Sequence, residues 1–153
     1  GPLLNPLQVK KQIIGVSNSE IVKFIPQVFL ALGGQKCISA HGLDGVDEVS
    51  ISANSLIYKT GKIDKQNPIA SKISEEIFNP EEYGFQKRDI SEIKGGDVKY
   101  NARKMMGLFN GEKGAYYDIV VLNSAFSFLV ADKANNLQEA IELAKEVLKK
   151  NLF

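Results

Sequence analysis

Two adjacent carboxylates, Asp47 and Glu48, are the residues whose type and spacing point most directly to chemistry. They end a short stretch, His41-Gly42-Leu43-Asp44-Gly45-Val46-Asp47-Glu48, in which two glycines mark a tight loop. Magnesium is commonly held by only one or two protein carboxylates, while waters and substrate phosphates supply the other ligands. The pair is therefore sufficient to predict a magnesium site.

The elements around the acid pair indicate where it lies. The apolar run Cys37-Ile38-Ser39-Ala40 predicts a buried strand that ends just before the loop. In open α/β sheets, ligands bind beyond the carboxyl ends of the strands, which is where this loop would be. The alternative is a loop of solvated acids, with His41 merely capping the strand. Short acidic loops are common, and spacing alone favours that alternative.

Further motifs lie before and after the acidic stretch. They are Gly1-Pro2-Leu3-Leu4-Asn5-Pro6, Gly15-Val16, Ala31-Leu32-Gly33, Asn79-Pro80-Glu81-Glu82-Tyr83-Gly84, Gly95-Gly96-Asp97 with Asn101-Ala102, and Leu122-Asn123 with Ala125. Several motifs in order are more specific than any one of them. Together with the acidic stretch they resemble anthranilate phosphoribosyltransferases, and the resemblance runs the length of the chain.

The resemblance implies a fold, a reaction and a set of binding residues. The fold is α/β, a central β-sheet flanked by helices, as part of the nucleoside phosphorylase/phosphoribosyltransferase catalytic domain. The reaction transfers phosphoribosyl from phosphoribosyl pyrophosphate to anthranilate in tryptophan biosynthesis, with Mg²⁺ as cofactor. Asp47 and Glu48 would hold the metal, and Gly1 and Pro2 would line the anthranilate side. No general base stands out, so no catalytic residue is assigned.

The family's enzymes also begin with a helical domain and a glycine-rich loop around the pyrophosphate, and neither has a counterpart in this sequence. We therefore expect residues 1–153 to be a single α/β domain, the C-terminal portion of the catalytic domain, inactive without the missing N-terminal half. In the family the helical domain makes the dimer contact. Because this sequence has no counterpart of that domain, the resemblance leaves open whether the chain forms a homodimer. Two other interpretations remain: a related phosphoribosyl or nucleoside transferase, and a non-catalytic binding module of the same fold.

Composition excludes several classes of protein. The 153 residues are 44% hydrophobic and 24% charged, close to the average for globular domains. A formal net charge of +1, without long basic runs, gives no footprint for nucleic acid. No apolar stretch approaches the roughly 18 to 20 residues that span a bilayer. The single cysteine, Cys37, suits a buried hydrophobe in a reducing compartment. We expect a cytoplasmic protein with no nucleic-acid or membrane partner.

Hydrophobic periodicity predicts alternating strands and helices. A helix over 21–32 is expected to follow a capping box at Ser17-Asn18-Ser19-Glu20 and to kink at Pro26, where the ring removes one hydrogen bond. The predicted strands are 12–16, 37–40, a hairpin of 54–60 with 62–66, and 72–78. The other predicted helices run from a cap at Asp97 to a stop at Gly111, over 116–129, and along the amphipathic stripe 137–148.

Asn123 lies inside the predicted helix 116–129. An amide in an apolar helix can contact a ligand, but hydrogen bonds to nearby backbone groups are its more common role, and we expect those. Gly95-Gly96-Asp97 is interpreted similarly, as a loop and helix cap rather than an anion site.

Overall fold

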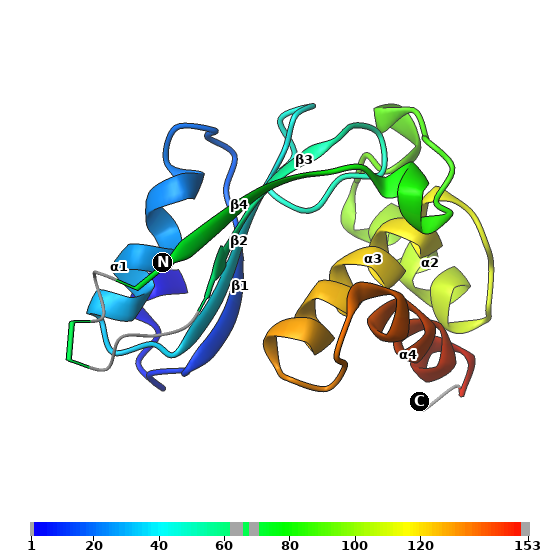
Figure 1. Ribbon diagram of the computed structural model, residues 1–153. Coiled ribbons are helices and arrows are strands. Elements are labelled where there is room, and N and C mark those ends of the chain that lie inside the picture. The colour runs from blue at the N-terminus through cyan, green and yellow to red at the C-terminus, as the bar shows by residue number, and fades with distance from the viewer. Residues whose placement is uncertain (1, 62–65, 68–70, 151–153) are drawn as a thin grey trace.

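The computed structural model describes residues 2–61, 66–67 and 71–150, and within these ranges a mixed sheet has helices on both faces (Figure 1). This arrangement confirms the predicted α/β class. The sheet order is β1-β2-β3-β4; β1 and β2 are parallel, and the other pairs are antiparallel. The strands are β1 (Lys11–Gly15), β2 (Lys36–Gly42), β3 (Ser55–Thr60) and β4 (Ile73–Phe78).

Helix α1 (Ile25–Ala31) lies on one side of the sheet, and α2 (Val98–Phe109), α3 (Ala115–Val130) and α4 (Leu137–Lys149) lie on the other (Figure 1). Side chains cap two of them, since Asp97 accepts from the Tyr100 N–H at 2.7 Å and Asn136 accepts from the Glu139 N–H at 2.9 Å. None of the helices in the described ranges has the length and apolar character needed to cross a membrane.

The core consists of two clusters, one on each side of the sheet. The larger joins the sheet to the helices α2–α4, and in it the rings of Phe78 and Phe126 form a T-shaped pair with centroids 5.3 Å apart. The smaller consists of Ile14, Ile25, Phe29 and Cys37 beneath α1. Burial raises the pKa of the Cys37 thiol to about 12, so this residue serves as a core hydrophobe, as predicted.

The predicted kink at Pro26 is wrong. A 3₁₀ turn (Val22–Phe24) comes first, and α1 begins at Ile25, so Pro26 lies in the first helical turn. A proline there removes no helical hydrogen bond, because the first N–H groups of a helix have no partner within it. Asn18, rather than the predicted capping box, bonds the preceding turn by accepting from the Glu20 N–H at 2.8 Å.

The predicted hairpin is confirmed in its first arm, β3. In its second arm, residues 62–65 lie outside the described residues. The strand that pairs with β3 after the turn is β4, which matches the separately predicted strand at 72–78. The Gly61 N–H donates to the Lys72 carbonyl at 2.8 Å and so extends this pairing by one bond.

An exposed apolar stripe follows the outer face of α1 and the turn before it. Ile21, Phe24, Val28 and Leu32 are 48%, 52%, 41% and 55% exposed, and their spacing places them on one side of the helix. Monomeric proteins rarely leave contiguous apolar surface open, and such patches usually mark contact surfaces.

We therefore predict that the chain associates reversibly in solution through this stripe. Light scattering over a concentration series should show an average mass that rises with concentration. Phe24→Gln with Leu32→Gln should lower that mass while leaving the melting temperature nearly unchanged, because both side chains are already about half exposed. A wild-type chain that stays monomeric over the whole series would contradict this prediction.

Asp132 connects the loop between α3 and α4 to the start of the sheet. Its carboxylate pairs with Lys11 of β1 and Lys36 of β2. Its backbone φ is +57°, a conformation that asparagine and aspartate tolerate better than most residues. Hydrogen bonds from Lys11 and then Lys36 lower the pKa of Asp132 from 3.8 to about 2.

This shift predicts a pH dependence of stability. A carboxyl group whose pKa is lower in the folded state stabilises the protein above its unfolded pKa, and that contribution is lost as the pH falls through the folded value. For Asp132 the window runs from about pH 4 down to about pH 2. Asp132→Asn keeps the backbone preference and removes the charge, so urea unfolding of this variant should depend less on pH in that window. Identical pH profiles would contradict the prediction.

Candidate functional site

The loop that carries the acid pair begins where β2 ends and is closed by its own backbone. The Gly42 N–H donates to the Val46 carbonyl at 2.8 Å, and the Gly45 N–H donates to the Gly42 carbonyl at 2.8 Å. Gly45 has a φ of +94°, which only glycine adopts easily. The predicted tight turn at the carboxyl end of the strand is thus confirmed.

The Asp44 side chain forms hydrogen bonds within the loop and is not a freely solvated acid. Its carboxylate accepts hydrogen bonds from Ser50 Oγ at 2.6 Å, from Ser52 Oγ, and from the Val46 N–H at 3.3 Å. Partial burial opposes ionisation of this group, but these bonds outweigh it, and the pKa of Asp44 is lowered. The charged side chain therefore holds the loop together.

Strand β1 supports the loop from the other side. His41 is buried, and its Nδ1 lies 2.8 Å from the Val16 carbonyl oxygen. Because a carbonyl oxygen only accepts, Nδ1 carries the hydrogen in this contact. At Gly15 a Cβ atom would lie 1.5 Å from the Asp47 carbonyl oxygen, so only glycine fits against the loop. The end of β1 thus fixes the backbone of Asp47.

Asp47 and Glu48 are brought together at the rim of a cavity of about 410 Å³. Both residues are exposed, and the cavity is otherwise lined by β1, β2 and α3. Neighbouring groups partly shield the Glu48 carboxyl; this desolvation, and then the charge of Asp47, raises its pKa. Across the described ranges neither acid forms an ion pair. The negative charge at this site is therefore uncompensated.

The donor set fits a magnesium ion only if non-protein ligands complete the shell. Among the described residues, no three His, Cys, Asp or Glu side chains converge on one point. Two adjacent carboxylates nevertheless match the usual protein share of a magnesium site, in which waters and phosphate oxygens provide the rest. Desolvation and then the charge of Asp47 raise the pKa of Glu48, and a cation between the two carboxylates would oppose both effects.

Asn123 of α3 joins the loop to the helix. Its Oδ1 accepts from the Val49 N–H at 3.0 Å, and its Nδ2 donates to the Val49 carbonyl at 2.9 Å. The same Nδ2 donates to the Ile119 carbonyl at 3.0 Å. This confirms the prediction that the amide bonds backbone groups, although Val49 lies 74 residues away in the sequence.

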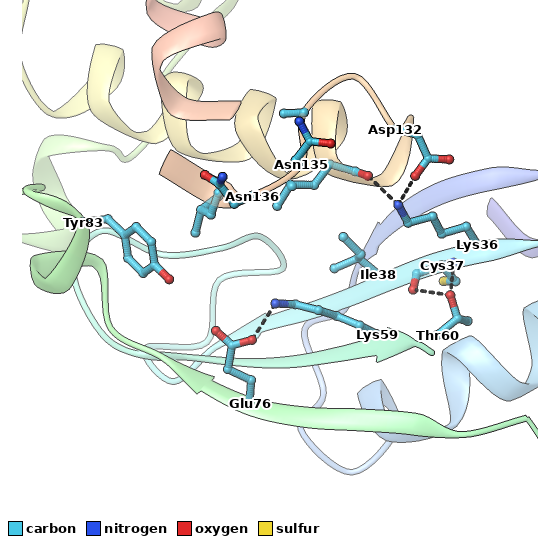
Figure 2. Close-up of a pocket in the computed structure, with 13 residues that line it drawn as sticks. Lys36, Cys37, Ile38, Lys59, Thr60, Glu76, Tyr83, Asp132, Asn135 and Asn136 are labelled. Atoms are coloured by element: carbon cyan, nitrogen blue, oxygen red, sulfur yellow. Dashed lines mark hydrogen bonds and ion pairs between the residues drawn. The ribbon is translucent and has the colours of Figure 1, made fainter. Parts of the chain in front are cut away.

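A second cavity, of about 540 Å³, lies at the amino end of β2, and no sequence motif indicated it (Figure 2). Its lining comes from segments far apart in the chain, including Lys36, Lys59, Glu76 and Asp132. Lys59 Nζ lies 2.5 Å from Glu76 Oε2, and Lys36 pairs with Asp132. A charged ligand there would have to compete with these pairs, so the acid-pair cavity is the better candidate.

Pro2, one of the two residues assigned to the anthranilate side, does not line the acid-pair cavity. Gly1 lies outside the described residues. Pro2 begins a 3₁₀ turn and lines another cavity, of about 320 Å³, together with Lys10 before β1 and Gly34 after α1. Their assignment to anthranilate stays a prediction based on the motif.

Comparison with known proteins now gives the family. The family described as "Glycosyl transferase family, a/b domain" matches residues 1–151. Anthranilate phosphoribosyltransferase from Petrotoga mobilis is 37% identical over 150 residues, which cover 97% of this chain and 41% of that protein. The chain therefore spans about two-fifths of the length of such relatives.

Solved structures agree with the sequence match. The crystal structure of anthranilate phosphoribosyltransferase from Thermus thermophilus superposes with a TM-score of 0.81 at 28% identity, over 99% of this chain and 42% of that one. The Saccharomyces cerevisiae enzyme in complex with PRPP and Mg gives a TM-score of 0.75 over 99% of this chain and 40% of that one; at 22% identity, its likeness is one of fold. This chain belongs to the glycosyl transferase family through its a/b domain, and its relatives there are anthranilate phosphoribosyltransferases.

Proposed function

We propose that this chain is the C-terminal portion of the catalytic domain of an anthranilate phosphoribosyltransferase, a cytoplasmic enzyme of tryptophan biosynthesis. Residues 1–153 would form one α/β domain of it. The observation that carries the proposal is the pair Asp47 and Glu48: two carboxylates without a protein counter-charge in the described ranges, on a loop fixed by its own hydrogen bonds, at the rim of a cavity.

The role of this pair follows from the charge on the leaving group. When the amine of anthranilate forms its bond to the ribose carbon, the bond from that carbon to pyrophosphate breaks, and pyrophosphate takes the electron pair. Magnesium bound to the pyrophosphate supplies positive charge against this developing negative charge. Asp47 and Glu48 would hold the metal from the protein side. Because the loop is fixed beforehand, little reorganisation would be needed during the reaction.

Two further parts of the proposal rest on the family motifs. Gly1 and Pro2 would line the anthranilate side. The partner that provides the phosphate-binding loop would be the N-terminal half of the enzyme, since this chain spans about 41% of its Petrotoga mobilis relative. No residue is assigned as a general base, and positioning of the two substrates would supply much of the acceleration.

The proposal predicts that the 153-residue chain alone does not catalyse the reaction. Donors preorganised around the transferred group normally supply a large part of an enzyme's rate enhancement, and this chain provides only the carboxylate side. Formation of phosphoribosyl-anthranilate should be followed with both substrates and magnesium present. Turnover on the order of 1 per second or faster, as in ordinary enzymes, would contradict the prediction.

In the complete enzyme, Asp47→Ala and Glu48→Ala should each lower kcat by roughly 100-fold or more, the scale of losing one charge-stabilising group. Both should also raise the magnesium concentration needed for half-maximal activity. Stability should change by less than about 0.5 kcal/mol, because exposed loop side chains contribute little to the core. The measurements are magnesium titrations of activity, with thermal melts of each variant.

Glu142→Ala is a matched control, since Glu142 is an exposed acid on α4 that pairs only with Lys145 among the described residues. This variant should keep both the activity and the magnesium dependence of the wild type. If Asp47→Ala and Glu48→Ala behave like the control, the pair are solvated loop acids and the metal assignment is wrong.

A further inference from the structure

We infer that Asn123 is the positioning residue of the acid pair, and that it acts by fixing the backbone beside Glu48 rather than by touching substrate. The inference rests on the proposed metal site and adds to it a residue that no motif assigns to metal binding. It is carried by the paired hydrogen bonds between Asn123 and Val49.

These two bonds hold both backbone polar groups of one residue. Asn123 Oδ1 receives the Val49 N–H at 3.0 Å, and Nδ2 donates to the Val49 carbonyl at 2.9 Å. Val49 is completely buried, so water could not replace these bonds without reopening the packing around it. The Asn123 side chain therefore fixes both the distance of Val49 from α3 and the orientation of its backbone.

Planarity of the peptide bond passes this constraint to Glu48. The Val49 N–H belongs to the peptide group that joins Glu48 to Val49, and that plane also contains the Cα atom of Glu48. A bond that orients this plane therefore orients the point from which the Glu48 side chain departs. On the other side of the loop, Gly15 packs against the Asp47 carbonyl. The two acids are thus held between α3 and the end of β1.

The hydrogen-bond capacity of Asn123 shows that it does not act on substrate. A side-chain amide has two N–H donors. Two carbonyls, those of Val49 and Ile119, accept from Nδ2 at 2.9 and 3.0 Å, so neither donor is left for a phosphate oxygen. Although Asn123 lines the same cavity as the acids, its effect on a bound anion must pass through the loop.

The test uses the 153-residue chain, with magnesium chloride and inorganic pyrophosphate as the probe. Amide NMR signals of Asp47 and Glu48 report binding, hydrogen exchange of the Val49 amide reports the bond to Asn123, and thermal melts report the global fold. In Asn123→Ala, Val49 should exchange faster and magnesium pyrophosphate should bind roughly 10-fold or more weakly, as when groups that orient metal ligands are lost.

A second variant, Asn123→Asp, guards against failure of the first to fold. Aspartate keeps an acceptor for the Val49 N–H but cannot donate to either carbonyl. Because it also adds negative charge near the cavity, the readout for this variant is the binding of magnesium chloride without pyrophosphate, which charge alone would strengthen. We expect weaker binding instead, because the carboxylate and the Val49 carbonyl repel each other and displace the loop.

Asn101→Ala is the matched control. Asn101 makes the same two bonds with Gly96, accepting from its N–H at 2.9 Å and donating to its carbonyl at 3.0 Å, on another helix. Its loss should change neither the Val49 exchange rate nor the binding of magnesium pyrophosphate.

The outcomes separate this inference from the proposed function. If wild-type Asp47 and Glu48 signals respond to magnesium pyrophosphate and Asn123→Ala binds equally well, the positioning role is wrong and the metal site stands. If Val49 exchange is unchanged in that variant, the inference is likewise overturned. If the wild type shows no response, the metal site is wrong and this role of Asn123 falls with it. Unfolding of both Asn123 variants would mark a purely structural amide and also overturn the inference.

Discussion

The parallel pairing of β1 and β2 is the constraint on which the rest of this structure depends. It places Gly15 beside Ala40, so the two strands end at the same edge of the sheet. The loop that leaves β2 must therefore pass over the end of β1, and only a residue without a side chain leaves room for the Asp47 carbonyl. Because α3 packs on the same two strands, its Asn123 can reach Val49. This arrangement fixes the position of Asp47 and Glu48.

Stability and function make opposite demands on this loop. Its structural polar groups are satisfied: Asp44 is bonded by two serines, and the backbone of Val49 is bonded by Asn123. Asp47 and Glu48 lack such partners. They are adjacent, the pKa of Glu48 is raised, and no cationic side chain in the described ranges pairs with either of them. Desolvation of Glu48 and its repulsion by Asp47 both disfavour the charged carboxylate, and such perturbed groups are typical of binding sites.

The sequence predicted the elements and the acid pair because both depend on local patterns. Adjacent residues such as Asp47 and Glu48 need no folding to be neighbours, and the strand before them is recognised from its own apolar residues. Contacts between residues far apart in the chain could be predicted less well. Asn123 was expected to bond backbone, but its partner at Val49 could not be named from spacing, and the cavity at Lys36 and Lys59 involves residues with no shared motif. At Pro26, a local rule failed because the start of the helix was placed several residues too early.

Two surfaces of the chain, the apolar stripe along α1 and the acid pair, lack partners among the described residues. The stripe on α1 exposes apolar side chains that water solvates poorly, and the acid pair exposes charge that no protein group in the described ranges balances. Each would be satisfied by something this chain does not contain: apolar surface by another polypeptide, and paired carboxylates by a cation with its phosphate ligands. The stripe and the acid loop are connected through β1 and β2, because α1 joins the two strands and both strands support the loop. A polypeptide that covered α1 would therefore stabilise the same strand pair that holds Asp47 and Glu48 in place.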